Sequence, residues 1–334
     1  MSTPSRVAVV GAGSWGTALA VQFARAGHPT VLWGRDAKRI ARLSAHRRNE
    51  DYLPRVTFPP LLSATADLKL AVASADEVLL AVPSHGFRPV LEALVRTGVA
   101  LTGLSWATKG FELETGLLPH QVVAALMPAD LPTAVLSGPT FANEVGAGLP
   151  SALTVASQNE KYARRLAEAI STDTFRAYTS GDIVGVEVGG ATKNVYAIGA
   201  GISDGLGFGA NTRIALVTRG LAEMMRLGLA LGARKETFMG LAGVGDLVLT
   251  CTDDQSRNRR FGLALAAGAT PDAARREIGQ VVEGYYSAQS VRFVAARHGV
   301  DMPIVEQIYG VLYEGLAPRD AVAALMRRPI TTDQ

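Results

Sequence analysis

The stretch Val7-Ala8-Val9-Val10-Gly11-Ala12-Gly13-Ser14-Trp15-Gly16 decides the fold of this 334-residue chain. A short apolar run, typical of a buried strand, leads into G-x-G-x-x-G, and residues 17–26 then carry a helical pattern. In this context Gly11 allows a tight turn, Gly13 lets backbone N–H groups reach a pyrophosphate, and Gly16 permits close packing of helix and strand. The start of the helix adds N–H donors and a partial positive charge. The stretch therefore predicts a dinucleotide-binding turn.

Strand and helix patterns alternate on the C-terminal side of this turn. Apolar runs indicate strands at residues 30–33, 76–82, 99–105 and 133–137, and residues 37–45 form a polar helix. Buried strands separated by helices are typical of a doubly wound parallel sheet. From about Ile183 the pattern is helical only, with helices expected at 214–231, 285–298 and 304–315. We predict an α/β chain with an N-terminal Rossmann domain at 1–182, which binds the dinucleotide, and an all-α substrate domain at 183–334.

The boundary region near Gly181 is rich in glycine. Nine glycines lie between Gly181 and Ala210, yet apolar residues such as Val195, Ile198 and Ile202 keep helical spacing. One interpretation is a glycine-lined helix that another backbone or a ligand approaches closely, at a cost of ~1 kcal/mol per glycine relative to alanine. The other is a flexible linker.

Composition narrows the function classes. The formal net charge of +3 is too small to indicate a nucleic-acid or membrane-surface partner. No stretch has the ~18 consecutive apolar residues of a transmembrane helix, and the first apolar run is too short for a signal peptide. The single cysteine, Cys251, cannot form an internal disulfide, which favours a reducing compartment. We expect a cytoplasmic protein that binds neither nucleic acid nor membrane.

The end of the second predicted strand bears on the choice of dinucleotide. Its sequence, Trp33-Gly34-Arg35-Asp36, places an arginine before the acid. Arg35 can pair with a 2′-phosphate, and Asp36 can cap the next helix. Arg35 therefore favours NADP(H), with NAD(H) as the alternative. It can also be an ordinary solvated charge.

Two of the six lysines lie in informative surroundings. Lys109 follows a predicted strand, and ligands of such sheets bind at the carboxyl ends of the strands. Lys193 lies on the predicted glycine-rich helix, where burying a lysine is costly. Burial or a neighbouring cation lowers the pKa of a lysine toward neutrality and makes it a usable general base. The alternative for both is a surface lysine.

A third cluster contains Gly245-Asp246-Leu247, Thr250-Cys251 and Ser256-Arg257-Asn258. A hydroxyl, a guanidinium and an amide just before a helix can clamp a phosphate. The alternative is a basic first turn, although cations are disfavoured at that end of a helix. Val282-Glu283-Gly284 adds an acid in a turn. We expect Cys251 in the core and no metal site, because the five histidines lack metal-ligand spacing.

Together these motifs resemble those of the bacterial NAD(P)-dependent glycerol-3-phosphate dehydrogenases. The similarity runs from about Arg6 to about Leu325, and it rests on residues 11–20, 109–110, 137–142, 193–195, 245–247, 256–258 and 282–284. The family usually has serine where Thr140 stands, and both side chains carry a hydroxyl.

The resemblance implies roles for individual residues. Besides the turn glycines and Arg35, the cofactor would be bound by Ser14, Trp15, Lys109, Ala142, Arg257, Val281 and Glu283. The substrate would be held by Lys109, Gly138, Thr140, Lys193, Asp246, Ser256, Arg257 and Asn258. Lys193 would be the proton acceptor, and Lys109 and Asp246 would complete the catalytic group.

The implied reaction is the reversible hydride transfer between NAD(P)H and dihydroxyacetone phosphate, which gives sn-glycerol 3-phosphate for phospholipid synthesis. The implied fold joins a Rossmann domain to a helical domain like that of 6-phosphogluconate dehydrogenase. Two other functions stay open. A β-hydroxyacid dehydrogenase would need a carboxylate grip rather than the clamp at residues 256–258, and a non-catalytic dinucleotide sensor would not need Lys193 and Asp246. The oligomeric state stays open too, a homodimer included.

Overall fold

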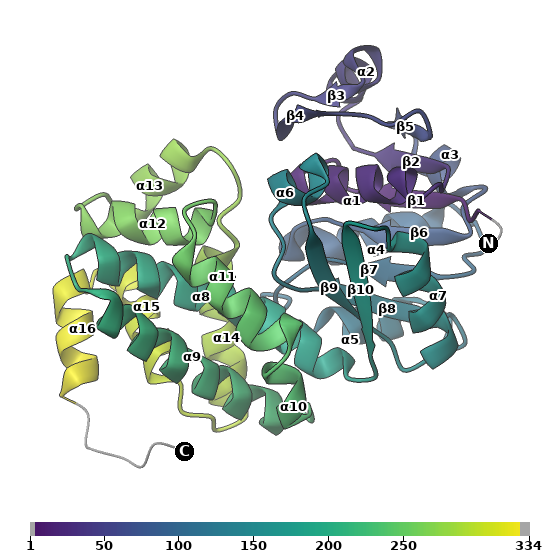
Figure 1. Cartoon of the computed structure of the whole chain (residues 1–334). Helices are drawn as coiled ribbons and strands as arrows, with labels where there is room; N and C mark the ends of the chain where they lie inside the picture. Colours follow the sequence, from purple (N-terminus) through teal and green to yellow (C-terminus); the bar gives the residue numbers. More distant parts are fainter. Residues whose placement is uncertain (1–3, 328–334) are drawn as a thin grey trace. The chain divides into compact units, whose positions relative to one another are not determined.

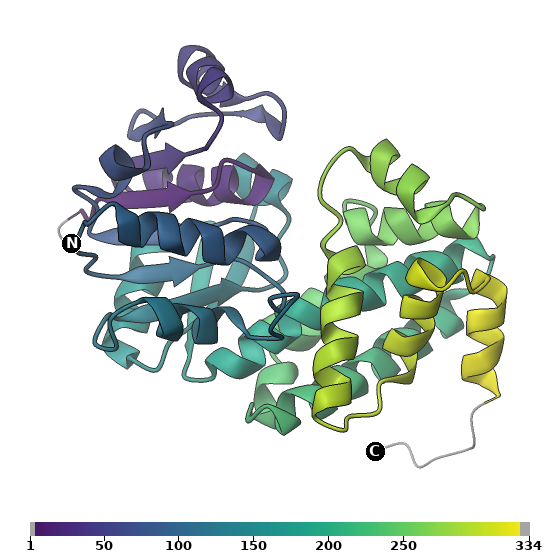
Figure 2. The same ribbon diagram turned by 180° about the vertical axis from the view of Figure 1, so that it is seen from behind.

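A computed structural model describes residues 4–327 of the chain (Figures 1 and 2). The described residues form two compact units: the first runs to Thr108 and resumes at 119–183, and the second comprises Lys109–Leu118 and the residues from Val184 onward. The outer ends of the two predicted domains, residues 1–3 and 328–334, lie outside the described residues.

An eight-stranded sheet forms the centre of the first unit. In spatial order its strands are β10 (Phe175–Ser180), β9 (Ser151–Ala156), β8 (Thr133–Ser137), β7 (Leu104–Trp106), β6 (Glu77–Leu80), β1 (Val7–Val10), β2 (Thr30–Trp33) and β5 (Leu62–Thr65). All neighbouring strands are parallel except β8 and β9, which are antiparallel. The predicted doubly wound parallel sheet is confirmed, with this one antiparallel pair in addition.

The strand β1 shows how the sequence places the glycine turn. All four of its residues are buried, and Val10 pairs with Trp33 of β2 on one side and with Leu80 of β6 on the other. A parallel strand covered on both faces must be apolar throughout, which is what Val7–Val10 provides. The carboxyl ends of β1, β2 and β6 therefore meet at one edge, where the turn begins.

Helices cover both faces of this sheet (Figures 1 and 2). One face carries α1 (Ser14–Arg25), α6 (Ala142–Ala147) and α7 (Glu160–Ile170); the other carries α4 (Ser84–Arg96) and α5 (Pro119–Leu126). Two further helices, α2 (Ala37–His46) and α3 (Leu68–Val72), follow β2 and β5. The strand expected at 99–105 is shorter and later than predicted, because only residues 104–106 pair with the sheet.

A small insert lies between α2 and β5. Its strands β3 (Arg48–Asn49) and β4 (Leu53–Thr57) pair with each other in antiparallel fashion and form a sheet of their own. The sequence patterns did not predict this insert, because its strands are short and lack regular alternation of apolar and polar residues.

The described part of the second unit contains helices and no strand, as predicted. These are α8 (Ile183–Gly205), α9 (Ala210–Ala230), α10 (Lys235–Phe238), α11 (Asp246–Thr252), α12 (Arg257–Ala266), α13 (Pro271–Ile278), α14 (Glu283–Arg297), α15 (Pro303–Tyr313) and α16 (Pro318–Met326), with a π-helical turn η1 (Leu241–Gly245) before α11.

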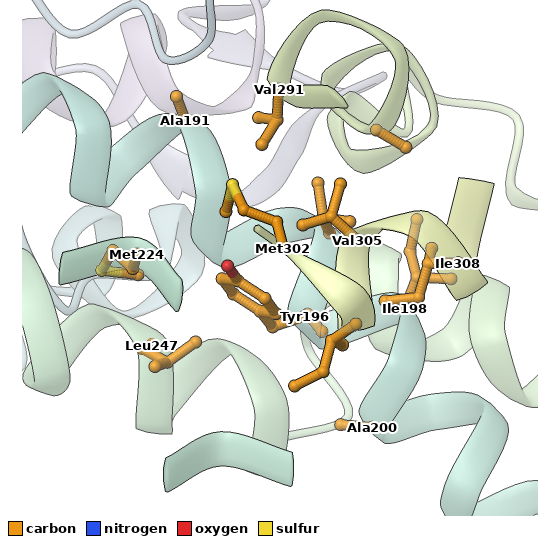
Figure 3. Packing of buried hydrophobic residues seen from close by; sticks show 14 of the residues in the cluster. Ala191, Tyr196, Ile198, Ala200, Met224, Leu247, Val291, Met302, Val305 and Ile308 are labelled. Atoms are coloured by element: carbon orange, nitrogen blue, oxygen red, sulfur yellow. The ribbon is translucent and has the colours of Figure 1, made fainter. Parts of the chain in front are cut away.

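The glycine-rich stretch forms α8, a continuous and largely buried helix of 23 residues, so the flexible-linker interpretation is wrong. Its glycines let other backbones come close: a Cβ at Gly189 would lie 2.3 Å from the carbonyl oxygen of Ala242, and one at Gly201 would lie 2.0 Å from that of Arg259. Apolar side chains complete the packing. Figure 3 shows these residues of the core, among them Ala191, Tyr196, Ile198, Ala200, Met224, Leu247, Val291, Met302, Val305 and Ile308.

None of the helices within residues 4–327 is both long enough and apolar enough to span a membrane.

Candidate active site

The glycine turn between β1 and α1 leaves the first N–H groups of α1 without a side-chain cap. Gly13 is the N-cap residue, and no acid lies in the first helical turn. Gly11 adopts φ +126°, and a Cβ there would lie 2.4 Å from the carbonyl oxygen of Ala81. A Cβ at Gly16 would lie 1.9 Å from the carbonyl oxygen of Gly11, so helix and turn touch. A helix start of this kind suits an anionic ligand.

Two further observations on the turn fit a dinucleotide. A Cβ at Gly13 would meet no protein atom within 4 Å, so this glycine leaves open space beside the turn. The indole Nε1 of Trp15 is buried and has no hydrogen-bond partner within the described residues. A buried donor without a partner is costly, and a ligand acceptor would remove that cost. Ser14 is the first residue of α1, next to both.

Arg35 is exposed just after β2. The carboxylate of Asp36 accepts a hydrogen bond from the backbone N–H of Arg39 at 3.0 Å and so caps α2, one of the roles considered for it. Burial lowers the pKa of His85, and the positive charge of Arg35 lowers it further. Arg35 is therefore close to the start of α4, at the edge where the glycine turn lies.

The connection from β8 to α6 holds three more predicted residues. Gly138 packs against β9, where a Cβ would lie 2.8 Å from the Cα of Leu153. The hydroxyl of Thr140 donates to the carbonyl oxygen of Gly138 at 3.3 Å, and Ala142 is the first residue of α6. Since β8 runs parallel to β7 and β6, this connection follows the same edge of the sheet as the glycine turn.

In the second unit, the partly buried Lys109 and the buried Lys193 and Asp246 form one cluster. Oδ2 of Asp246 accepts a hydrogen bond from Lys109 Nζ at 2.7 Å, and its Oδ1 accepts one from Lys193 Nζ. Lys193 Nζ also donates to the hydroxyl of Thr250 at 3.0 Å, and that hydroxyl donates to the backbone oxygen of Asp246 at 2.6 Å. The side chain of Asp246 is only 1% exposed, so both lysines meet a carboxylate removed from water.

The charges of this cluster act on each other's pKa values. Burial lowers the pKa of Lys193 to about 7; the carboxylate of Asp246 opposes this shift, and the ammonium of Lys109 adds to it. Burial alone would raise the pKa of Asp246, but the two ammonium groups outweigh burial and hold it below its usual value. Asp246 is therefore ionised at neutral pH, and Lys193 can give or take a proton there.

The predicted phosphate clamp forms the start of α12, where its three side chains have different surroundings. Ser256 is the N-cap, and its hydroxyl accepts a hydrogen bond from the backbone N–H of Arg259 at 3.2 Å. The amide of Asn258 donates to Asn194 Oδ1 at 2.9 Å and accepts from the N–H of Gly284 at 2.8 Å. Asn258 thus joins α8, which carries Lys193, to the start of α14.

The guanidinium of Arg257 reaches the segment before α14, where its Nη1 donates to Gln280 Oε1 at 3.1 Å. Val281 belongs to this segment, and Glu283 begins α14. Burial raises the pKa of Glu283 to about 7 despite the charge of Arg257, and its Oε2 has no hydrogen-bond partner in the described chain. The predicted residues from 256 to 283 therefore lie together.

Cys251 lies in the core, as predicted, and burial raises the pKa of its thiol to about 12. No group of three or more His, Cys, Asp or Glu residues within 4–327 is arranged to hold a metal ion. The predicted site residues fall into two sets, one in each unit.

Sequence reasoning missed several residues that hold this site. Asn49 and Arg39 contact the glycine turn, Asn194 and Gln280 hold the α12 start, and the hydroxyl of Thr250 contacts Lys193. Only Asn194 and Thr250 lay in motifs that the sequence singled out. The others are polar residues whose importance depends on tertiary contacts.

A Rossmann-type sheet with an open glycine turn, followed by helices that bury a lysine against an aspartate, defines a dinucleotide-dependent dehydrogenase. Comparison with known proteins identifies the family. The N-terminal part of NAD-dependent glycerol-3-phosphate dehydrogenases matches residues 6–163, and the C-terminal part matches residues 182–323. The chain therefore belongs to the NAD-dependent glycerol-3-phosphate dehydrogenase family, and it is an oxidoreductase with NAD(P)+ as acceptor.

Individual relatives agree. The glycerol-3-phosphate dehydrogenase (NAD(P)+) of Nitrosococcus oceani is 56% identical over 323 residues, which cover 97% of this chain and 94% of the relative. That of Aeromonas salmonicida is 54% identical over 329 residues, 98% of both chains. The crystal structure of glycerol-3-phosphate dehydrogenase from Coxiella burnetii is similar with a TM-score of 0.94 and 44% identity, covering 97% of this chain and 99% of that one.

Proposed function

We propose that this chain catalyses the reversible hydride transfer between NAD(P)H and dihydroxyacetone phosphate, giving sn-glycerol 3-phosphate for phospholipid synthesis. The observation that carries the proposal is the buried Nζ of Lys193, held by Asp246 and Thr250. Residues 1–182 would bind the cofactor and residues 183–334 the substrate. Family membership supports the reaction, and the two sets of predicted residues support the division.

Lys193 is the proton acceptor in this proposal. In oxidation its neutral amine takes the proton of the C2 hydroxyl; in reduction its ammonium polarises the ketone and returns a proton. Asp246 holds the amine in place and partly offsets the cost of charging it, and its second oxygen fixes Lys109. Because Asp246 is buried and ionised, its two carboxylate oxygens hold both lysine ammonium groups in fixed orientation.

Substrate and cofactor are held by the other predicted residues. Arg257, with Ser256 and Asn258, would bind the phosphate, so that remote binding energy orients C2. Lys109, Gly138 and Thr140 would contact the remainder of the substrate. The cofactor would be held by Gly11, Gly13, Ser14, Trp15, Gly16, Arg35, Lys109, Ala142, Arg257, Val281 and Glu283; when bound, it supplies or accepts the hydride at C2.

For the cofactor we propose a preference for NADP(H), with NAD(H) also used. The exposed guanidinium of Arg35 at the end of β2 supports this preference, because Asp36 is engaged in capping α2. We also propose that the enzyme works in the cytoplasm on a small phosphorylated substrate, without nucleic-acid or membrane partners. A homodimer is compatible with this function.

The test is oxidation of NADPH and of NADH by the purified enzyme with dihydroxyacetone phosphate, for the wild type and for Lys193→Ala. We expect the wild type to turn over with both cofactors, with the higher kcat/KM for NADPH. Loss of the proton donor should lower kcat by about three orders of magnitude or more. The Kd of NADPH, measured by its fluorescence, should stay within about twofold, because Lys193 is assigned to the substrate and not to the cofactor.

Lys235→Ala is the matched control, since Lys235 is an exposed lysine of the same unit. An active Lys193→Ala enzyme would remove Lys193 from the chemistry. A wild type that binds NADPH without reducing dihydroxyacetone phosphate would contradict the proposed reaction.

A further inference from the structure

The backbone carbonyl of Ala12, in the middle of the glycine turn, accepts hydrogen bonds from two side chains. Arg39 Nη2 donates to it at 2.7 Å and Asn49 Nδ2 at 3.1 Å. Asn49 Nδ2 also donates to the hydroxyl of Thr17 at 2.7 Å, beyond the turn on α1. Asn49 is only 1% exposed, and burying an amide so completely is costly unless its hydrogen bonds are made. Through Asn49, the insert is therefore hydrogen-bonded both to the turn, at Ala12, and to α1, at Thr17.

These contacts determine the direction of the next N–H group. The described peptide bonds are all trans, and a trans peptide is planar with its C=O and N–H pointing in opposite directions. With the Ala12 carbonyl held by Arg39 and Asn49, the Gly13 N–H must point away from them. No protein atom of the described chain accepts a hydrogen bond from this N–H. A Cβ at Gly13 would also meet open space.

Arg39 is itself held firmly in place. Its guanidinium carbon lies 3.9 Å from the centre of the Tyr52 ring, and its Nε lies 3.3 Å from the carboxylate of Asp51. Its backbone N–H is fixed by Asp36, the cap of α2. A guanidinium is a strong donor, so the hydrogen bond to Ala12 constrains the turn more than a neutral donor would.

We propose that Asn49 and Arg39 are positioning residues for the dinucleotide. By holding the Ala12 carbonyl they keep the Ala12–Gly13 peptide in the orientation that presents the Gly13 N–H to the pyrophosphate. The inference rests on the proposed binding of NAD(P)H at this turn. Preorganisation of this kind raises affinity because the ligand does not have to reorient the peptide. A purely structural role would stabilise the fold without affecting one ligand more than another.

The experiment compares two ligands on variants of both residues. In Asn49→Leu and Arg39→Met the Kd of NADPH, measured by fluorescence, should rise about tenfold, or about 1.4 kcal/mol, because the Ala12–Gly13 peptide is no longer held in the binding orientation before the ligand arrives. Adenosine 2′-phosphate, which lacks the pyrophosphate, should bind these variants within about twofold of the wild type by calorimetry. Arg39→Lys keeps a charged donor and should recover part of the NADPH affinity.

Two control variants separate the orientation of the Ala12–Gly13 peptide from the general stability of the fold. Thr17→Val removes the Asn49 contact that does not involve Ala12, and Arg42→Met removes an exposed arginine of α2 that pairs with Asp51. Both should bind NADPH within about twofold of the wild type. If Asn49→Leu does not fold, the NADPH affinities of Arg39→Met and Arg39→Lys test the proposal instead. The Arg39 side chain is 22% exposed, so we expect its replacement to leave the fold intact.

Wild-type NADPH affinity in folded Arg39→Met would overturn the proposal. An equal loss of affinity for adenosine 2′-phosphate would overturn it too, because the effect would not depend on the pyrophosphate. A wild type that binds neither ligand would instead contradict the proposed cofactor site.

Discussion

Glycine is concentrated in two regions of this chain, the turn at residues 11–16 and the helix α8. The surroundings of the glycines differ between the two regions. In the turn, Gly11 has a positive φ, and the Cα of Gly13 faces open space. In α8, Gly189 and Gly201 lie against the carbonyl oxygens of other helices. The turn thus uses glycine in three ways, for a positive φ at Gly11, for open space beside Gly13 and for backbone contact at Gly11 and Gly16, whereas Gly189 and Gly201 of the helix serve backbone contact alone.

The difference shows what each region contributes to function. The turn offers N–H groups to an anion, so it must stay accessible to the ligand. Gly13 therefore has no protein atom packed where a Cβ would lie. The helix carries Lys193 and Asn194, and close contact with η1 and α12 places them beside Asp246 and Asn258. Each helical glycine costs ~1 kcal/mol relative to alanine, which the packing must offset. Substitutions in the two regions should therefore fail in different ways.

The largest effect is expected for Gly201→Ala. Helix propensity favours alanine by ~1 kcal/mol, but the new Cβ would lie 2.0 Å from the carbonyl oxygen of Arg259 and 3.0 Å from the Cα of Gly262. Backbone cannot yield as a flexible side chain does, so we expect a net destabilisation of about 2–3 kcal/mol. Calorimetry should show the unfolding transition of the helical unit lowered by about 4–12 °C.

Gly13→Ala is the control from the other region. Its φ of −81° and the open space beside it suit alanine, so the Tm should change by no more than about 2 °C. If Gly201→Ala were as stable as Gly13→Ala, the close approach of α8 and α12 could not be the reason for a glycine at 201.

The turn region was predictable from sequence because several local signals coincide there. An apolar strand, spaced glycines and a helical pattern follow one another within twenty residues, and the strand register then carries the turn to the sheet edge. The helical nature of α8 was predictable only as one of two interpretations, because its glycines oppose its apolar spacing. Packing against distant residues such as Ala242 and Arg259 decides in favour of the helix.

The polar contacts of the site were less predictable. The residue types of Lys193 and Asp246 were recognised, but their pairing joins positions 53 residues apart. Ser256 was predicted to offer a hydroxyl to phosphate, and it also caps α12. Asn49 lies in a segment without periodicity, and its hydrogen bonds to the Ala12 carbonyl and the Thr17 hydroxyl explain why an asparagine is buried there.

A smaller effect is expected from pH, and it concerns the helix region through Lys193. Burial lowers the pKa of Lys193 from 10.5 to about 7, so its amine is mostly protonated at pH 6 and mostly neutral at pH 8. Oxidation of glycerol 3-phosphate needs the neutral amine, and its kcat/KM, which reports the pKa of the free enzyme, should rise about tenfold from pH 6 to a plateau above pH 8. Reduction uses the ammonium, and its kcat/KM should fall by a similar factor over the same interval.

The oxidation and reduction rates serve as controls for each other when kcat/KM is measured at low substrate concentration. Loss of folded enzyme at one end of the interval would lower both rates together. If both rates changed in the same sense with pH, Lys193 would not be the titrating proton acceptor.

The smallest effect is expected for Gly209→Ser, at a glycine that belongs to neither group. Gly209 is the N-cap of α9, its φ is −76°, and a Cβ there would meet no atom within 4 Å. A serine hydroxyl can accept a hydrogen bond from the first turn of α9, so we expect a stabilisation of a few tenths of a kcal/mol by calorimetry.

Gly207→Ser is the matched control. A Cβ at Gly207 would also meet no atom within 4 Å, but the φ of +81° at this position should cost about 1 kcal/mol. If Gly209→Ser were as destabilising as Gly207→Ser, glycine at 209 would serve a purpose other than backbone conformation or close contact, and this division of the uses of glycine would be incomplete.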